Sequence, residues 1–443
     1  WRVSLASQIS SVLDTTTTAY MKPSITGFVD GNFIWTQRGA EEPSTADGST
    51  NRADTIGGDW LSLLGNNFGP NNPYLTANEV SATYGPVGGS TSKYTATNCL
   101  AQEITVASVV SMAITCKYAA GVGANLEWVI TVGGQLSEAS TDIVRYKTPV
   151  INSISGNAVD SASSTIGGGS VTLTGTYFGR SSDGAPVVHY GPSGSPDKYL
   201  AVGCSLSSAQ TTITCTKQPG VGVNLFWRIT VGDQPSDVFV DTATSYSKPV
   251  IESFSGVGAS DASTRGGDEV TIDGSHFGPQ SYMTWTVTIP SEELATTAAD
   301  TSVTQIGTNG VGTLAVALDG SATTTITIRS AIGQVFDNAA DLVIGGGSGF
   351  TVAQAKLDSV TSVSHTEVSA TYGPDGNTDK YDATDCVVLS HTQITCNTEP
   401  GVGGNLKWVV IIGGQESVPS TAFTNYISPT LIAMSGDAVN GPT

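Results

Sequence analysis

One stretch of sequence occurs three times, and this repetition limits the folds open to the chain more than any other feature. The copies begin at Gly121, Gly220 and Gly401, and each reads Gly-Val-Gly-x-Asn-Leu-x-Trp. Alternating apolar residues follow each tryptophan, and a glycine-containing turn and a glutamine come next. A long segment that recurs in this way indicates repeated structural modules rather than one domain. The sequence therefore predicts three modules of one kind within 443 residues.

The repeated stretch has the pattern of a half-buried strand. In the second copy, Leu225, Trp227 and Ile229 share one face, because side chains alternate between the two faces of a strand. We therefore expect core positions for the equivalent tryptophans Trp128, Trp227 and Trp408. The Gly-Val-Gly start resembles a dinucleotide-binding loop, but that fingerprint has a glycine at its sixth position and a helix after it. Here the sixth residue is leucine and a strand follows, so phosphate binding is not expected.

Each module repeats one order of strand and turn signals. A proline-led strand comes first, and strands ending in Phe-Gly and Tyr-Gly-Pro follow it. Two cysteines, the tryptophan strand and a closing strand near a tyrosine complete the module. Short strands with turn signals about every ten residues are typical of an immunoglobulin-like β-sandwich. We therefore predict an all-β chain of tandem sandwiches: module 1 at 22–147, module 2 at 148–247 and module 3 at 248–428.

Module 3 contains an insert at 281–366. Its β-like runs predict a small β subdomain, since an unstructured loop of this length is unusual inside a module. The two ends of the chain also match modules: 1–21 match a last hairpin, and 429–443 match a first strand. We therefore expect a segment of a longer tandem array. The alternative is a self-contained chain whose end segments complete neighbouring subunits by strand addition.

The order Pro-x-Ile, Gly-Gly-x-x-Val-Thr-Leu-x-Gly-x-x-Phe-Gly and Cys…Ile-Thr-Cys resembles the IPT/TIG domain. The match is best at 148–180, close at 248–278 and weaker at 22–69. This immunoglobulin-like module occurs in plexin-type receptors, some transcription factors and long surface proteins, as a non-enzymatic building block. The resemblance implies an extracellular TIG-repeat protein, of the kind found in ectodomains and in surface hairs of protists and algae. A shared fold identifies the module and leaves the function open.

Each module contains two cysteines at corresponding positions: Cys99 and Cys116, Cys204 and Cys215, and Cys386 and Cys396. An even number at equivalent positions indicates one disulfide in each module. Disulfides persist in oxidising compartments, so we expect an extracellular or cell-surface protein. Two alternatives remain open: zinc binding, which needs four ligands for each metal, and buried free thiols.

Acidic residues outnumber basic residues, 38 against 18, and the formal net charge is −20. Phosphate backbones and anionic lipids repel such a chain. We therefore expect no nucleic-acid partner and no membrane contact by this segment. The simplest role of the charge is solubility, and the alternative is an acidic surface that holds divalent cations.

Signatures of catalysis are missing from the sequence: HExxH, GxSxG and Walker motifs do not occur. We expect neither an enzyme nor a cofactor. His189 and His276 lie beside strand-end aromatic residues, where a core or turn role is usual. One acidic turn is a weak calcium candidate, formed by Asp375, Asn377, Asp379 and Asp382. It lacks the glycine and the glutamate at positions six and twelve of a calcium loop, so a solvated turn is the alternative.

The second strand of module 1 carries Trp60 and Leu64 at positions that are polar in the other two modules. Large apolar side chains on an outer face suggest a possible interface. The alternative is that an insert of the same module, which contains Phe33, Ile34 and Trp35, covers them.

These observations favour a structural protein, a tandem array that forms an extracellular filament, a flagellar hair or a coat. Its partners would be copies of itself or sister array proteins. The alternative is an adhesion or receptor ectodomain that binds a protein or a glycan through the insert of module 3. A third possibility is an enzyme that carries these modules as accessories outside its catalytic part.

Overall fold

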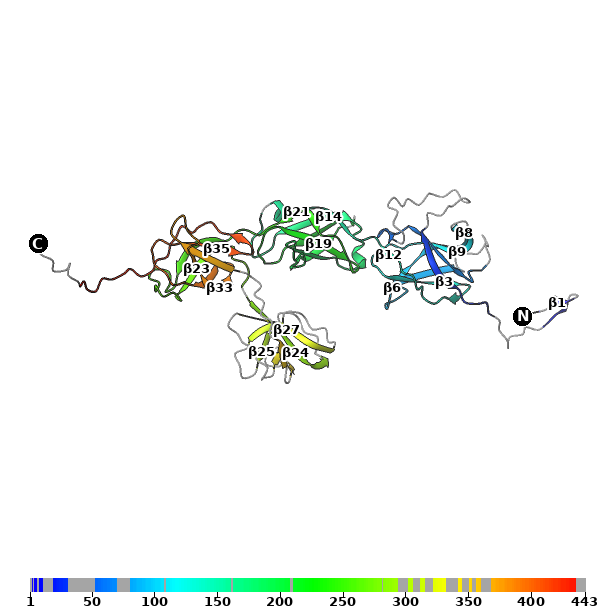
Figure 1. Cartoon of the computed structure of the whole chain (residues 1–443). Helices are drawn as coiled ribbons and strands as arrows, with labels where there is room; N and C mark the ends of the chain where they lie inside the picture. Colours follow the sequence, from blue (N-terminus) through cyan, green and yellow to red (C-terminus); the bar gives the residue numbers. More distant parts are fainter. Residues whose placement is uncertain are drawn as a thin grey trace.

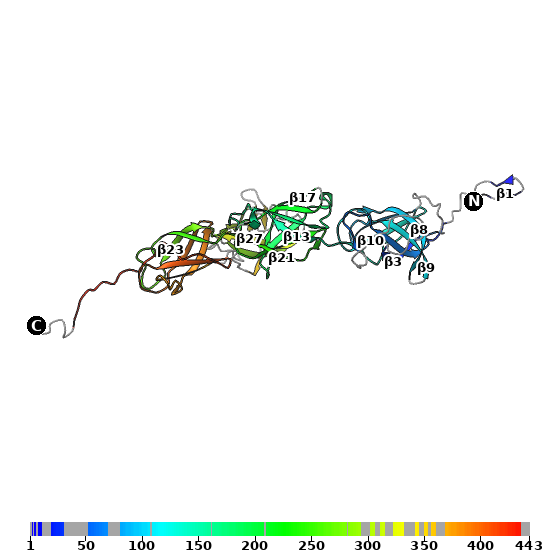
Figure 2. The ribbon, with the colours of Figure 1, turned by 90° about the horizontal axis from the view of Figure 1, so that it is seen from above.

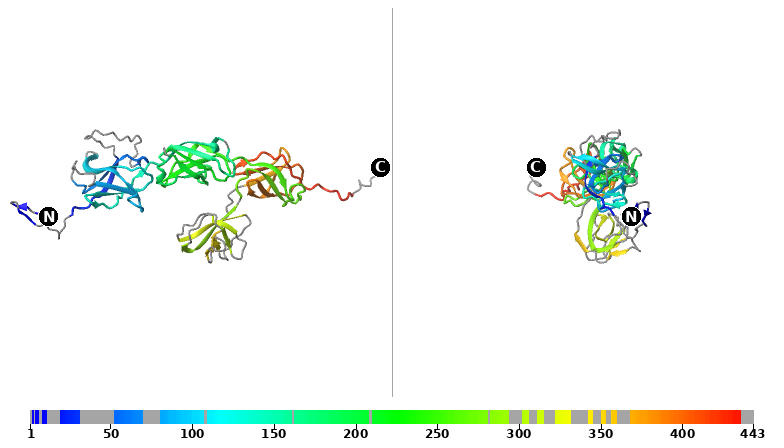
Figure 3. Two further views of the ribbon diagram at one scale, coloured as in Figure 1. Left: turned by 180° about the vertical axis from the view of Figure 1, so that it is seen from behind. Right: turned by 90° about the vertical axis from the view of Figure 1, so that its right-hand side faces the viewer.

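The computed structural model contains three β-sandwiches in a row (Figure 1). It describes residues 19–30, 52–69, 80–106, 109–160, 162–207, 210–280 and 368–435, with short strands near the N-terminus and within the insert of module 3. The sandwiches follow one another along one line and overlap when the molecule is viewed end-on (Figures 2 and 3). The prediction of an all-β chain of tandem sandwiches is confirmed.

Module 1 consists of two four-stranded antiparallel sheets, in the orders β3-β5-β9-β8 and β11-β10-β6-β7. A short parallel pair, β4 (Arg52–Ala53) with β12 (Arg145–Tyr146), lies outside these sheets. The strands of the two sheets are β3 (Ser24–Asp30), β5 (Trp60–Asn66), β6 (Val80–Pro86), β7 (Tyr94–Thr95), β8 (Thr97–Val106), β9 (Val109–Lys117), β10 (Leu126–Val132) and β11 (Gln135–Leu136).

Module 2 repeats this arrangement with the sheets β13-β14-β18-β17 and β16-β15-β19-β20, and β21 also pairs with β19. Its only described helices are the short α1 (Asn157–Asp160) and the 3-10 turn at Ser181–Asp183. The strands are β13 (Val150–Ser155), β14 (Ser170–Thr176), β15 (Val187–Gly191), β16 (Tyr199–Leu200), β17 (Val202–Leu206), β18 (Thr212–Thr216), β19 (Leu225–Val231), β20 (Gln234–Pro235) and β21 (Phe239–Thr244).

Module 3 has the sheets β22-β23-β34-β33 and β32-β31-β35-β36. Its strands are β22 (Val250–Ser255), β23 (Glu269–Ser275), β31 (Val368–Gly373), β32 (Tyr381–Asp382), β33 (Thr384–Ser390), β34 (Gln393–Asn397), β35 (Lys407–Ile412) and β36 (Gln415–Glu416). Each module thus places its tryptophan strand, β10, β19 or β35, between two other strands of a sheet.

The insert of module 3 lies between β23 and β31 and forms its own seven-stranded sheet, in the order β29-β28-β25-β26-β27-β24-β30. This sheet lies beside the row of sandwiches (Figures 1 and 3). Its strands are β24 (Tyr282–Glu293), β25 (Ser302–Gln305), β26 (Val311–Leu314), β27 (Ala322–Ala331), β28 (Leu342–Ile344), β29 (Phe350–Val352) and β30 (Lys356–Ser359).

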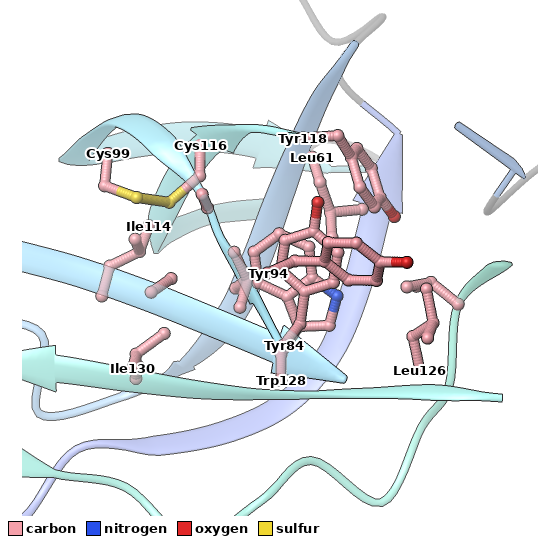
Figure 4. Packing of buried hydrophobic residues seen from close by; sticks show 14 of the residues in the cluster. Leu61, Tyr84, Tyr94, Cys99, Ile114, Cys116, Tyr118, Leu126, Trp128 and Ile130 are labelled. Atoms are coloured by element: carbon pink, nitrogen blue, oxygen red, sulfur yellow. A yellow bond between two sulfur atoms is a disulfide. The ribbon is translucent and has the colours of Figure 1, made fainter. Parts of the chain in front are cut away.

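The core of each module forms around its tryptophan. Trp128, Trp227 and Trp408 have no exposed surface, and each indole stacks on a tyrosine of the neighbouring strand with ring centroids 4.1, 4.5 and 4.2 Å apart. Residues along β19 alternate between buried and half-buried, as the period of two requires. Figure 4 shows Trp128 and Tyr84 in the same core as one disulfide.

The two end segments differ in structure. β1 (Ser4–Leu5) and β2 (Gln8–Ile9) form a hairpin in which Leu5 pairs with Gln8. The closing hairpin of module 2 has the equivalent register, Val231 to Gln234. Residues 429–435, where we expected a first strand, form no strand and are exposed. A strand needs a hydrogen-bonded neighbour, and no described strand lies beside this segment.

Candidate functional site

The residues that suggested metal or histidine chemistry do not form a site. Within the described residues, no group of three or more His, Cys, Asp and Glu side chains is placed to hold a metal ion. In the candidate calcium turn, the Asp375 carboxylate lies 3.1 Å from the Lys407 ammonium group, and the Asn377 N–H donates to the Pro374 carbonyl. The remaining candidates, Asp379 and Asp382, complete no such group. No helix among the described residues is long and apolar enough to cross a membrane.

The two histidines that we considered have structural surroundings. His189 lies on β15 opposite Arg228 of β19. His276 has a φ of +64° in the turn before the buried Phe277. Neither belongs to a described cluster of metal-binding side chains.

The six cysteines are joined within modules, Cys99 to Cys116, Cys204 to Cys215 and Cys386 to Cys396. None is free, so neither the zinc alternative nor the thiol alternative applies to the structure. Each disulfide joins adjacent strands of the first sheet, β8 to β9, β17 to β18 and β33 to β34. The modules therefore carry one cross-link each, at corresponding places.

The candidate interface on module 1 is partly covered. Trp60 and Leu64 are half-buried, and the Lys117 ammonium lies 4.8 Å from the centroid of the Trp60 ring. Between them, Ser62 is buried and hydrogen-bonds to Thr115 at 2.8 Å. The segment at 33–35 that we considered as a cover lies outside the described residues, so both interpretations stay predictions.

The structure brings together a different set of residues, at the joints between modules. At the first joint, Val122 lies in the Gly-Val-Gly loop of module 1 but belongs to the core of module 2. It packs between two glycines of module 2: a Cβ atom added to Gly179 or Gly232 would lie 2.3 or 2.7 Å from a Val122 methyl carbon. Only glycine permits so close an approach. One valine of module 1 is therefore buried in the core of module 2.

The second joint has the same construction. Val221, in the Gly-Val-Gly loop of module 2, belongs to the core of module 3. A Cβ atom on Gly413 would lie 2.8 Å from its Cγ2 atom. Gly413 and Gly232 occupy the same place in the hairpin that follows the tryptophan strand. We call Val122, Val221 and the equivalent Val402 the loop valines.

A hydrogen bond closes each joint. The Gln234 side-chain N–H donates to the Tyr146 carbonyl at 3.1 Å, and the Gln415 side-chain N–H donates to the Tyr246 carbonyl at 3.0 Å. Gln234 and Gln415 are buried, so each bond satisfies an amide and a carbonyl within the contact. Gln135 of module 1 makes the same bond to the Tyr20 carbonyl at 2.9 Å. We call these three residues the hairpin glutamines.

Tyrosines hold each loop valine in position within its own module. The Tyr94 hydroxyl donates to the Val122 carbonyl, and the Tyr199 hydroxyl donates to the Val221 carbonyl, both at 2.8 Å. In module 1, the hydroxyls of Tyr84 and Tyr146 lie 2.7 Å apart. Burial raises the pKa of Tyr84 to about 12 and raises that of Tyr146 further. These phenols therefore stay neutral and act as fixed hydrogen-bonding groups.

The second joint contains one further polar contact. The Thr165 hydroxyl of module 2 lies 3.2 Å from the Nδ1 atom of His391 of module 3. Burial lowers the pKa of His391, which favours the neutral ring at this contact. The contact is an addition to the pattern that both joints share.

The joint residues were not among our predictions, although the sequence contains a signal for them. The loop valine and the hairpin glutamine recur in all three copies of the repeated stretch. Neither a loop nor a hairpin turn requires these two residue types. Their repetition therefore pointed to a contact beyond the module, and only the placement of two modules shows which one.

No protein-family model matches the chain, and no curated protein matches it by sequence. Solved structures with a similar fold include the surface glycan-binding protein PbSGBP-B from Prevotella bryantii. Its identity is 10% and its TM-score is 0.28, over 92% of this chain and 97% of that chain. SGBP-B from a complex xyloglucan utilization locus in Bacteroides uniformis has 10% identity and a TM-score of 0.17, over 91% and 98%. The Escherichia coli adhesin FdeC has 11% identity and a TM-score of 0.20, over 72% and 94%. Because these TM-scores are low, the similarities carry no argument about function.

Proposed function

We propose that this chain is a non-enzymatic structural part of an extracellular surface protein, in which modules of IPT/TIG type are held in a row to build a filament, hair or coat. The observation that carries the proposal is the joint, which occurs twice with the same residue types in the same geometry. Val122 and Val221 each join the core of the next module, and Gln234 and Gln415 each bond to the preceding module.

Physical reasons connect this joint to a structural role. An apolar side chain of one module that is buried in the core of the next resists rotation of one module against the other, because turning would expose it to water. The linkers are also short: only Lys147 and Thr148 lie between Tyr146 and Pro149. Domains of one chain are expected to move relative to each other unless an apolar interface holds them. The joint supplies such an interface. The three disulfides support an oxidising compartment.

The proposal is tested by breaking one joint. The substitution Val221→Asp places a charge in the core of module 3. Because a buried charge is unfavourable, module 3 should be released from module 2. Electron microscopy of single molecules should then show a broad range of angles at this joint, while the first joint stays straight. Small-angle scattering should show a wider spread of end-to-end distances.

The matched control is Val223→Asp, two residues further along the same loop. Val223 is partly exposed and belongs to no described core. This variant should keep the angles of the unmodified chain. If Val221→Asp leaves the angles unchanged as well, the joint does not hold the row and the structural role loses its support.

A second candidate is adhesion through the insert of module 3. Its sheet is separate from both sheets of the sandwich and lies beside the row (Figure 1), where it would be accessible to a protein or a glycan. Replacing 281–366 with a short Gly-Ser linker should abolish binding to cells or glycan arrays and leave the row intact. Binding that survives the deletion would exclude this site.

A further inference from the structure

Each module contains one parallel backbone contact, between its closing segment and the chain that follows its first strand. In module 1, this contact is the parallel pair β4 and β12. In module 2, Ser163 pairs in parallel with Tyr246, and in module 3, Ala262 pairs in parallel with Tyr426. The other described strand pairs of module 2 are antiparallel. The three modules thus share a parallel contact, which we call the clamp.

Two backbone hydrogen bonds form the clamp of module 2, and both use Ser163. The Ser163 N–H donates to the Ser245 carbonyl at 2.9 Å, and the Ser247 N–H donates to the Ser163 carbonyl at 2.8 Å. Ala262 makes the same two bonds in module 3, at 3.0 and 2.9 Å. Each of these residues therefore holds the closing segment of its module on both sides of the clamp tyrosine.

The clamp lies where the chain passes from one module to the next. Tyr246 is paired in the clamp, and its carbonyl accepts the Gln415 bond of the second joint. At the opposite end of module 2, β13 begins at Val150, shortly after Tyr146, whose carbonyl accepts the bond of the first joint. The chain therefore enters module 2 at one joint and leaves it at the other, along the line of the row (Figure 1).

Tension along the row would act on the two clamped segments in opposite directions. It would pull β13 and the chain that follows it toward module 1, and it would pull the closing segment toward module 3. Because Ser163 and Tyr246 pair in parallel, these two pulls slide one segment along the other. Hydrogen bonds of a sheet cross from strand to strand, so sliding loads them together, whereas lifting one end of a strand breaks them singly.

Further hydrogen bonds hold the closing segment of module 2 in place. The Tyr246 N–H donates to the Gly222 carbonyl at 2.9 Å, and the Tyr246 hydroxyl donates to the Gln218 carbonyl at 2.6 Å. The buried Lys217 side chain donates to the Ser245 carbonyl at 3.2 Å. The closing segment must therefore break several bonds before the module can extend.

We propose that these modules bear tension along the row, and that the clamp is the contact that resists it. This role rests on the proposed function, because a filament or hair passes a pull from one module to the next. The clamp recurs in all three modules, next to the tyrosine that precedes the following module or chain segment. Its parallel direction gives the sliding geometry that an antiparallel pair pulled at one end would lack.

The test is single-molecule force spectroscopy of the full chain, tethered at its two ends and held at constant force. Forced unfolding is governed by the unfolding rate. The modules differ in length, 22–147, 148–247 and 248–428, so their unfolding steps can be told apart. Ser247→Pro removes one clamp bond of module 2, because proline has no N–H. The unfolding rate of module 2 under force should rise by about fivefold or more, while modules 1 and 3 keep their rates.

Two further variants complete the test. Ile427→Pro removes the corresponding bond of module 3, from the Ile427 N–H to the Ala262 carbonyl, and should speed only module 3. Ser195→Pro is the matched control in module 2, because it removes an exposed turn bond to the Pro192 carbonyl, away from the clamp. Under force, this control should unfold within about twofold of the unmodified rate. Chemical denaturation of both module 2 variants shows how far each substitution lowers stability without force.

Equal effects of Ser247→Pro and Ser195→Pro on module 2 under force would overturn the load-bearing role, and so would an unchanged rate of module 3 in Ile427→Pro. If module 2 does not fold in Ser247→Pro, its step is missing and Ile427→Pro decides. The proposed function fails separately. If Val221→Asp changes the joint angles while the clamp variants unfold like the unmodified chain, only the load-bearing role is wrong. If Val221→Asp changes nothing, the proposed function itself loses its support.

Discussion

The indole of Trp128 offers a sensitive test of how these cores are stabilised. In modules 2 and 3, the tryptophan N–H donates to a threonine hydroxyl: Trp227 to Thr244 at 3.1 Å, and Trp408 to Thr424 at 2.8 Å. Module 1 has Val144 at this position. Val144 pairs with Leu126, just as Thr244 pairs with Leu225 and Thr424 pairs with Leu406. The buried Trp128 N–H has no hydrogen-bond partner.

Replacing Val144→Thr should supply that partner. An unsatisfied buried polar group costs about 1–3 kcal/mol, and valine and threonine have nearly the same shape. The new hydroxyl also needs an acceptor for its own hydrogen. In module 2, the Thr244 hydroxyl donates to the Leu225 carbonyl at 3.4 Å. The equivalent acceptor in module 1 is the Leu126 carbonyl. After the cost of burying the hydroxyl, we expect module 1 to gain about 1 kcal/mol.

Hydrogen exchange of the β10 amides measures this gain within one module of a multi-module chain. A gain of about 1 kcal/mol slows exchange through module opening by roughly fivefold. The reverse change, Thr244→Val, should speed exchange in β19 by a similar factor or more. As a control, Val80→Thr adds a buried hydroxyl four residues along β6 from Tyr84, away from the indole, and should destabilise module 1. If Val144→Thr behaves like Val80→Thr, the missing hydrogen bond is not what limits the stability of this core.

Two further predictions concern module 2. Burial lowers the pKa of Lys217 to about 7. Between about pH 7 and 10, the unfolded module therefore binds more protons than the folded module. The free energy of unfolding of module 2 should then rise with pH, by on the order of a few kcal/mol over this range. Denaturation at several pH values should show this rise in the unmodified chain and lose it in Lys217→Met, and an identical rise in both would contradict the assignment. Replacing both Cys204 and Cys215 with alanine removes a cross-link of sequence separation 11, which should destabilise module 2 by about 3 kcal/mol on the chain-entropy model. A denaturation midpoint for module 2 that does not move would contradict the chain-entropy estimate for this cross-link.

Local patterns predicted the fold of the three modules, although residues 429–435 do not form the strand that the pattern predicts. Alternation along Leu225 to Val231 predicts a half-buried strand because neighbouring side chains must face opposite sides. Three copies of one pattern predict three modules, and paired cysteines in each copy predict one cross-link in each. These properties depend on residues close together in the sequence, or on repetition of the same local arrangement. A reader of the sequence can therefore derive them without knowing how modules meet.

The candidate site could not be derived in this way. The sequence drew attention to Asp375 and to Trp60, which stand out by residue type, while the joints use a valine and a glutamine that look ordinary in a loop and a hairpin. Their role depends on where the glycines of the next module lie, 57 and 110 residues from Val122 in the sequence. Sequence distance says nothing about that placement.

The sequence alone determines the repeat and the acidic charge, and it predicts the strands and the cross-links of the modules, since each of these follows from local pattern or composition. The tertiary structure determines that Val122 and Val221 belong to the cores of the following modules, and that Trp128 lacks the partner that the other two tryptophans have. It also determines that Val402 is exposed while its equivalents are buried. The physical reason is that burial and hydrogen bonding depend on the surroundings in space, and identical residues in the same repeat can have different surroundings.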